Sequence, residues 1–353
     1  MRVVIVGASG NAGTALLRRL RDEAGIDVVG VSRRVFDSDI EWHSCDIGAD
    51  DAGTRLERIF AGADAVVQLA WQIQPSHDRR RLFRTNVLGT RNVVVAALAA
   101  GVRTLVVASS VGAYAPGPKD RYVTEAWPAT GIVESSYSTH KALVEKLLDG
   151  VERDRPELRV VRLRPGLIFQ RSAGTEIARY FAGPLLPVGL LRARRIPVLP
   201  AHPALRVQGV HADDVAEAYA RALLSDVRGA FNVAAAPVLD TRLAARMFGG
   251  VRVPVPGVAL YAAADLSWRL RLQPVDAGWV AMGLKAPLMS CDRIARELGW
   301  APVHDAESTL REFIAGFAER AHDDTPPLSG DPELAGRPRG LLRGRLPGTG
   351  NPY

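Results

Sequence analysis

A glycine-rich turn close to the N-terminus constrains the fold of this chain more than any other feature. The apolar run at residues 3–6 leads directly into Gly7, and glycine recurs at every third position up to Gly13. A helical pattern over residues 14–22 follows the turn. Without a Cβ atom the backbone can approach a pyrophosphate closely, and the helix N-terminus then offers free N–H groups. We therefore expect a dinucleotide site rather than an ordinary strand-to-helix turn, built from Gly7, Ser9, Gly10, Asn11, Ala12 and Gly13.

Short apolar runs alternate with helical patterns through the first half of the chain. Residues 27–31, 65–69, 104–108 and 159–163 have strand character, and residues 56–61, 86–100 and 135–153 have helical spacing. Such alternation is typical of a parallel sheet with helices on both faces. We therefore predict an α/β fold, with a Rossmann-type doubly wound parallel sheet and a smaller C-terminal substrate lobe.

The pattern changes after about residue 170, where Pro and Gly become frequent. We expect residues 1–170 to form the dinucleotide-binding Rossmann domain and residues 171–322 mainly a substrate-binding lobe, with elements returning to the Rossmann domain. Residues 323–353 are rich in Pro, Gly and Arg, which predicts a flexible tail outside the catalytic unit. The apolar residues 180–191 leave two interpretations open, a flap over a hydrophobic substrate or a buried piece of the small lobe.

Composition excludes several classes of protein. The net charge is +7, but the arginines are spread along the chain and no nucleic-acid module is present, so we expect no nucleic-acid partner. No apolar run is long enough for a membrane span. The two cysteines, Cys45 and Cys291, have no metal-binding spacing, so no metal site is expected. This sparse cysteine usage, with no room for a leader before the first strand, favours a cytoplasmic protein with a small-molecule substrate.

The second strand is followed by basic residues where an NAD-binding protein usually has an acid. Ser32, Arg33 and Arg34 stand at this point, and hydroxyl and guanidinium groups suit a 2′-phosphate. We therefore favour NADP over NAD, although both arginines could instead be solvated and the cofactor be NAD. Asp46 and Ile47 follow the third strand, where the aspartate is either an acceptor for the adenine amino group or a plain turn residue.

Tyr137 and Lys141 have a spacing that suits acid–base chemistry. Residues four apart stand on one face of a helix, so the phenol and the ammonium should be neighbours. A nearby cation should lower the pKa of the tyrosine towards neutrality and make it a general acid–base. Ser109 and Ser110 end the strand at residues 104–108, at the edge of a parallel sheet where ligands bind.

In chain order, these motifs resemble the extended short-chain dehydrogenase/reductases, the NAD-dependent epimerase/dehydratase family. The resemblance covers about residues 1–320 and includes further motifs at residues 64–70, 86–90, 164–166 and 210–215. It implies that Ser110 polarises the substrate oxygen, Tyr137 moves the proton and Lys141 binds the nicotinamide ribose. Asn86 would support the helix near the active site, and a homodimer is expected. Further cofactor contacts implied are Leu69, Ala70, Trp71, Asn86, Ala108, Ser109, Tyr137, Lys141, Pro165, Gly166, Leu167 and Ile168.

Departures from the family pattern narrow the reaction. Val111 and Gly112 stand where sugar-nucleotide dehydratases have an acidic pair, which disfavours dehydration. No asparagine follows the strand at residues 159–163, which weakens the case for a sugar-nucleotide substrate. Trp71 stands where a small residue is more usual. Candidate substrate contacts are Trp71, Gln72, Gln74, Ser110, Tyr114, Gln170 and Arg206.

Three functions remain as hypotheses. The first is an NAD(P)-dependent oxidoreductase that transfers hydride to or from a secondary alcohol or ketone. The second is a nucleotide-sugar epimerase with tightly bound NAD. The third is a non-catalytic dinucleotide sensor, which is disfavoured because Ser110, Tyr137 and Lys141 are all present.

Overall fold

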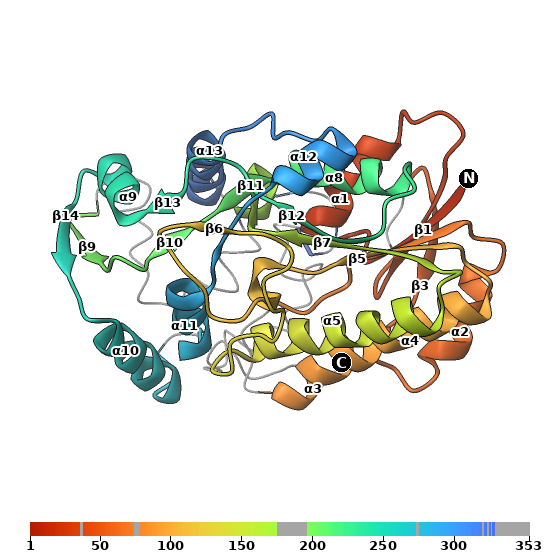
Figure 1. Cartoon of the computed structure of the whole chain (residues 1–353), viewed down its shortest axis with the longest axis horizontal. Coiled ribbons are helices and arrows are strands. Elements are labelled where there is room, and N and C mark those ends of the chain that lie inside the picture. The colour runs from red at the N-terminus through yellow and green to blue at the C-terminus, as the bar shows by residue number, and fades with distance from the viewer. Residues whose placement is uncertain are drawn as a thin grey trace.

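A parallel sheet of seven strands, in the order β12-β7-β5-β4-β1-β2-β3, forms the centre of the molecule (Figure 1). The computed structural model describes residues 1–35, 38–73, 78–174, 196–272, 275–319, 321–322, 325 and 327–328. The strands are β1 (Arg2–Val6), β2 (Asp27–Ser32), β3 (Glu41–Ser44), β4 (Ala65–Gln68), β5 (Thr104–Ala108), β7 (Arg159–Pro165) and β12 (Gly229–Val233). The strand order reverses between β1 and β4, which is where ligands bind in sheets of this type.

Helices cover both faces of the sheet. On one face lie α1 (Asn11–Leu20) and α8 (Ala212–Leu223), and on the other lie α2 (Ala52–Phe60), α4 (Gly89–Ala99) and α5 (Ser136–Asp154) (Figure 1). Strand β1 shows why its sequence is apolar throughout. Val3 and Ile5 enter the core under α1 and α8, whereas Val4 and Val6 enter the core under α2 and α4. Successive side chains of a strand point to opposite faces, so a strand buried on both sides needs a continuous apolar run. The predicted Rossmann-type α/β fold is confirmed.

The second part of the chain divides between the sheet and a small lobe. The lobe contains β9 (Val198–Ala201), β10 (Arg206–Val207), β13 (Leu239–Asp240), α9 (Thr241–Phe248), β14 (Val251–Pro254), α10 (Gly257–Arg269), α11 (Ala277–Lys285) and α13 (Ala306–Glu319). In contrast, β12 is the edge strand of the main sheet, and α8 and α12 (Asp292–Leu298) lie beside it (Figure 1). Elements after residue 170 therefore contribute both to the small lobe and to the main sheet.

Two short parallel strand pairs join the parts. Strand β6 (Tyr122–Val123) pairs with β15 (Leu288–Met289), and β8 (Leu167–Phe169) pairs with β11 (Gly209–His211). Such short strands carry too few residues for a periodic sequence signal, and none of the four was predicted. The short elements α3 (Arg79–Phe83), η1 (Arg84–Leu88), η2 (Val111–Ala113) and η3 (Arg171–Ala173) complete the described structure.

The C-terminal segment differs from its prediction where it is described. Leu328 is fully buried, and Pro327 lines the cleft at the end of β1. Part of the segment expected outside the catalytic unit therefore packs against it, because Leu328 has apolar surface to bury. The apolar residues 180–191 lie outside the described residues. Within the described ranges, no helix is long and apolar enough to cross a membrane.

Candidate active site

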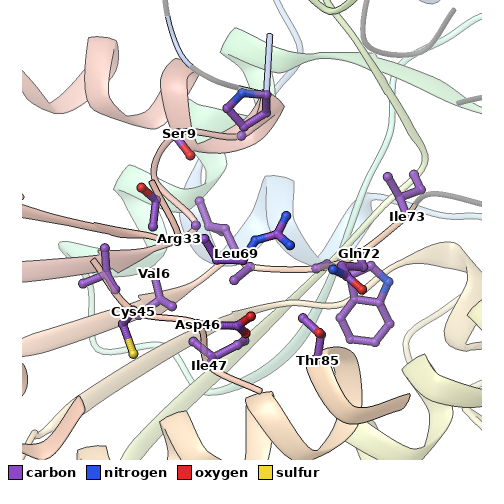
Figure 2. A pocket seen from close by; sticks show the side chains of 17 residues that line it. Val6, Ser9, Arg33, Cys45, Asp46, Ile47, Leu69, Gln72, Ile73 and Thr85 are labelled. Carbon is purple, nitrogen blue, oxygen red and sulfur yellow. The ribbon is translucent and has the colours of Figure 1, made fainter. Parts of the chain in front are cut away.

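A cleft opens at the carboxyl ends of β1, β2 and β4, and Figure 2 shows side chains such as Ser9, Arg33, Asp46 and Thr85 around it. Eleven of its lining residues coincide with residues predicted from the sequence to bind cofactor or substrate, whereas Val6, Val31, Cys45, Ile73, Thr85 and Pro327 were not predicted. Ile73, Thr85 and Pro327 reach the cleft only through the folding of the chain. The lining residues are Val6, Gly7, Ser9, Gly10, Val31, Ser32, Arg33, Cys45, Asp46, Ile47, Leu69, Ala70, Trp71, Gln72, Ile73, Thr85 and Pro327.

The glycines of the turn are required by close contacts of the backbone. Gly7 has a φ of +88°, and a Cβ atom there would lie 2.5 Å from the backbone nitrogen of Ala70. A Cβ atom on Gly13 would lie 2.5 Å from the carbonyl oxygens of Gly7 and Ala8. The turn therefore packs tightly between β4 and α1, as only glycine permits.

The start of α1 has the properties of an anion site. Gly10 precedes the helix and gives it no side-chain cap, and the first turn has no acidic residue. The N–H groups of the first turn of a helix have no partner within the helix, and its dipole favours negative charge there. These residues fit the pyrophosphate of a dinucleotide.

The adenosine end of the cleft is polar and open. Arg33 is exposed and lines the cleft beside Ser32, whose hydroxyl donates to the carbonyl oxygen of Arg34 at 2.5 Å. Asp46 also lines the cleft, and its Oδ1 accepts from the N–H of Gly48 at 2.9 Å. Asp46 therefore closes a turn and also faces the cleft, and its role as an acceptor for adenine stays a prediction.

Ser110 and Tyr137 meet at the carboxyl end of β5. The Ser110 side chain lies close enough to the Tyr137 hydroxyl to lower its pKa, and Ser110 Oγ accepts from the N–H of Gly112 at 3.0 Å. Tyr137 stands in the first turn of α5, with Lys141 one turn further along. The Nζ of Lys141 donates to the carbonyl oxygen of Ala108 at 2.7 Å. The fold therefore brings all three residues predicted to carry the chemistry to one place.

Burial, rather than the neighbouring cation, dominates the titration of this pair. It raises the pKa of Tyr137 to about 12, although the nearby Ser110 side chain opposes the rise. It lowers the pKa of Lys141 to about 7. The expected lowering of the tyrosine pKa is therefore wrong for the protein alone. The physical reason is that the Lys141 ammonium lies 3.5 Å from the ring centroid of Trp71 and 5.9 Å from that of Tyr137, while burial disfavours the phenolate.

A buried charge cluster lies behind these residues. Glu145, one turn after Lys141, accepts two hydrogen bonds from Arg164 at 2.8 Å each and one from Arg162 at 2.8 Å. Ser109 donates to the same carboxylate at 2.5 Å, so its hydroxyl is used inside the protein. Burial favours a higher pKa for Glu145, but the hydrogen bonds and charge of Arg164, with those of Arg162 and Ser109, lower it to about 2.

Tyr114 belongs to this cluster and not to a substrate site. It is fully buried; its hydroxyl donates to Oδ1 of Asn232 at 2.6 Å and accepts from Arg164 at 3.0 Å. Burial raises its pKa to about 12. The prediction of a substrate contact is corrected here, because the packing of β5 against β7 and β12 turns the ring inwards.

Two other predicted polar residues support the cleft instead of facing a substrate. Asn86 holds the backbone of Gln72 on both sides, accepting from its N–H at 2.7 Å and donating to its carbonyl oxygen at 3.0 Å. Gln170 donates to the backbone and side-chain oxygens of Asn11 at 3.1 and 2.6 Å, and so braces the glycine-rich turn. Asn86 and Gln170 are therefore positioning residues.

The remaining predicted residues lie in three places. Asn11 donates to the carbonyl oxygen of Ile168 at 3.3 Å, which ties the turn to the segment of Pro165, Gly166, Leu167 and Ile168. Arg206 lies apart from the cleft, in a hollow of the small lobe with His202, Arg242 and Arg252. Gln74 lies outside the described residues.

Sequence reasoning missed Glu145 and Trp279 as neighbours of the centre. Glu145 had a signal, since it stands four residues after Lys141 on the same helix face. Trp279 had none; α11 brings its ring 5.1 Å from that of Tyr137, between centroids. The ring of Trp71 approaches Tyr137 edge-on, with a centroid distance of 5.9 Å. Two indoles therefore flank the candidate acid–base.

Several known proteins resemble this chain in sequence or in fold. An uncharacterized protein of Mycobacterium tuberculosis is 30% identical over 325 residues, covering 91% of this chain and 30% of that protein. The 2-alkyl-3-oxoalkanoate reductase of Shewanella oneidensis is 29% identical over 172 residues, 47% of this chain and 44% of the enzyme. This chain thus spans less than half the length of either relative. The NAD complex of UDP-glucose 4-epimerase from Thermus thermophilus has the same fold, with a TM-score of 0.64 and 22% identity over 90% of this chain and 99% of that structure.

The family follows from the sequence as a whole. Residues 3–234 match the NAD dependent epimerase/dehydratase family, which is well over half of the chain. The strand order, the glycine-rich turn and the cleft agree with this match, so the resemblance drawn from the motifs is confirmed. The chain belongs to the NAD-dependent epimerase/dehydratase family, among the extended short-chain dehydrogenase/reductases.

Proposed function

We propose that this chain is an NADP-dependent oxidoreductase that reduces a ketone to a secondary alcohol or carries out the reverse reaction. The observation that carries the proposal is the closeness of the Ser110 and Tyr137 side chains, beside Lys141 and the cleft. The bound nicotinamide would supply or accept the hydride. The protein's own groups would handle the substrate oxygen and its proton.

Each catalytic side chain has a role that its surroundings support. Tyr137 would give the proton to the developing alkoxide, and a pKa of about 12 keeps the phenol protonated at neutral pH, as an acid requires. Ser110 would donate a hydrogen bond to the same oxygen. Lys141 would hold the ribose hydroxyls, as the family resemblance implies.

The residues after Ser110 argue against dehydration. Gly112 packs against the ring of Tyr137, and a Cβ atom there would lie 2.8 Å from a ring carbon. An acidic side chain could not enter at that position without moving the tyrosine. A second acid–base of the kind needed to eliminate water is therefore missing from the η2 turn, and simple hydride transfer is the reaction that the remaining groups suit.

The preference for NADP rests on the end of β2. Arg33 is exposed at the cleft, and its two neighbours, Ser32 and Arg34, are not acidic. A guanidinium pairs well with a phosphate, whereas an acid there would repel one. The aromatic walls formed by Trp71 and Trp279 favour a substrate with an apolar or ring-shaped portion, and the resemblance to a 2-alkyl-3-oxoalkanoate reductase supports the same class.

We also propose a homodimer and a cytoplasmic location. Leu88, Val95 and Leu143 are exposed apolar side chains on η1, α4 and α5, which lie on one side of the sheet. Exposed apolar groups gathered on neighbouring helices are typical of protein interfaces. Cys45 and Cys291 are free cysteines, which suits a reducing compartment.

A nucleotide-sugar epimerase is the second candidate, and the structural likeness to UDP-glucose 4-epimerase favours it. Such an enzyme would keep its nicotinamide bound and return the hydride to the other face of the sugar. The two candidates differ in whether the cofactor exchanges with solution, which can be measured directly.

The test is a carbonyl screen with purified protein. We expect NADPH oxidation with an apolar β-keto acid or cyclic ketone, and we expect Tyr137→Phe to lower kcat by about 10²–10⁴-fold. Tyr122→Phe, at an exposed position on β6, is the matched control and should leave the rate unchanged. If the protein instead carries tightly bound NAD, oxidises no NADPH and interconverts UDP-sugars, the oxidoreductase proposal fails and the epimerase takes its place.

A further inference from the structure

Lys141 is closed in on all sides although it lies beside a ligand cleft. Only 2% of its surface is exposed. One N–H of the ammonium donates to the carbonyl oxygen of Ala108, and the indole ring of Trp71 covers the ammonium at 3.5 Å. That separation is van der Waals contact, so no other group fits between the ring and the nitrogen. A hydroxyl group that is to bind Lys141 must displace one of these neighbours.

Of these neighbours, Trp71 is the one that can move at least cost. Ala108 belongs to β5, which is paired with β4 and β7 along its length. Tyr137 is fixed in the first turn of α5. The indole Nε1 of Trp71, by contrast, is buried with no hydrogen-bond partner. A buried donor without a partner is unfavourable, so turning the indole towards the cleft would gain a hydrogen bond to offset the lost contact with the ammonium.

The backbone at this point stays in place when the side chain turns. Asn86 holds Gln72, the next residue, by two hydrogen bonds. Ala70, the residue before, packs against the backbone of Gly7. Movement is thus confined to rotation about the side-chain bonds of Trp71, and needs no change in the loop.

We propose that Trp71 is a side-chain gate, whose indole covers Lys141 and turns away to admit the ribose hydroxyls of the dinucleotide. Because the ring also meets Tyr137 edge-on, the same rotation uncovers one side of the phenol. The cover thereby links access to the lysine with access to the acid–base. The identity of the ligand rests on the proposed function, whereas the cover over Lys141 does not.

The first experiment measures the cover without any ligand. The chain has four lysines, so acylation by an N-hydroxysuccinimidyl ester can be followed at each by peptide mass spectrometry. Lys146 is exposed on the same helix and is the internal reference. Burial lowers the pKa of Lys141 to about 7, so its amine is nucleophilic at pH 8 wherever reagent can reach it. In the wild type we expect Lys141 to react at least about tenfold more slowly than in a variant without the indole, a factor that corresponds to about 1.4 kcal/mol for turning the ring away.

Two variants separate a cover from general burial. Trp71→Ala should raise the reaction rate of Lys141 at least about tenfold over the wild type. Trp71→Phe keeps a ring over the ammonium and should preserve most of the protection. The rate of Lys146 should stay the same in all three proteins. Lys119, whose Nζ donates to the carbonyl oxygens of Arg206 and Gly283, should stay protected in each variant, which checks that the variants are folded. Equal protection of Lys141 in the wild type and Trp71→Ala would overturn the gate.

The second experiment asks whether the gate controls binding. In stopped-flow fluorescence, the observed rate of NADPH binding should reach a plateau in the wild type, because the rotation precedes binding. In Trp71→Ala it should rise linearly with concentration. Trp279→Ala, which removes the other indole beside Tyr137, should keep the plateau. A plateau in Trp71→Ala would refute the gate, whereas failure of both proteins to bind any dinucleotide would refute the proposed function and leave the acylation result standing.

Discussion

At the proposed pyrophosphate end of the cleft the chain offers mainly backbone, whereas at the proposed catalytic end it offers large buried side chains. The first end consists of the glycine-rich turn, the uncapped start of α1 and the exposed Arg33. The second consists of Trp71, Tyr137 and Lys141, with the cluster around Glu145 behind them.

This difference separates binding from chemistry. Backbone N–H groups are fixed by the fold, so the first end is ready for an anion without rearrangement. Buried titratable groups instead have pKa values set by their surroundings, as the values of about 12 for Tyr137 and about 7 for Lys141 illustrate. Substitutions at the first end should therefore change mainly affinity, and those at the second end mainly stability, titration and rate.

The largest effect is expected at the cluster behind the catalytic end. Glu145→Gln keeps the size of the side chain but leaves the buried guanidinium of Arg164 without its charged partner. Breaking a buried ion pair from one side costs about 3–5 kcal/mol, so urea unfolding should show a loss of that order. Glu157→Gln removes an exposed pair with Arg155 and should show no resolvable change. Equal stability of the two variants would mean that the Glu145 cluster does not stabilise the fold behind Tyr137 and Lys141.

The backbone at the first end should be almost as sensitive. In Gly13→Ala the new methyl group would lie 2.5 Å from two carbonyl oxygens, and overpacking of this kind costs about 1–3 kcal/mol. Dinucleotide affinity should fall as well, because the turn must open. Gly53→Ala is the matched control in α2, where nothing lies within 4 Å of the added carbon, and helix propensity predicts a gain of up to about 1 kcal/mol. Thermal unfolding and fluorescence titration distinguish the two; equal behaviour would contradict the close contact.

The pH dependence of stability tests the catalytic end by itself. Burial lowers the pKa of Lys141 from 10.5 to about 7, so between these values the unfolded chain binds the proton and the folded chain does not. The free energy of unfolding should therefore rise with pH in this window, relative to Lys141→Met, by up to about 1.4 kcal/mol per pH unit. Below pH 7 the difference should be constant. Urea unfolding from pH 6 to about 9.5 measures it, and a pH-independent difference would show that Lys141 titrates normally.

The smallest effect is expected at the adenosine end. Arg33→Ala removes one exposed guanidinium, and we expect NADPH to bind about tenfold more weakly while NADH is unaffected. Raising the salt concentration should reduce the wild-type preference, since exposed charges are screened. Arg153→Ala, on the far end of α5, should change neither affinity. Equal affinity of the wild type for both cofactors would remove the argument for NADP.

Much of the catalytic end could be predicted because its residues lie in short local patterns. Tyr137 and Lys141 are one helical turn apart, and Ser110 ends an apolar strand, so spacing alone brings them near the same edge. The inward turn of Tyr114, the contact of Trp279 and the approach of Pro327 to the cleft could not be predicted, since each joins parts of the chain more than 100 residues apart. The pKa of Tyr137 was mispredicted for the same reason, because burial is a property of packing and not of spacing.

The sequence by itself determined the main strands and helices of the first half, the glycine-rich turn and the family, because these depend on local backbone preferences and on apolar periodicity. The tertiary structure decided how each polar side chain is used. It assigned Ser109 to a buried carboxylate and Ser110 to Tyr137, although the two serines are adjacent. Successive residues at a strand end point in opposite directions, and only the packing of α5 against the sheet selects which of them meets the acid–base.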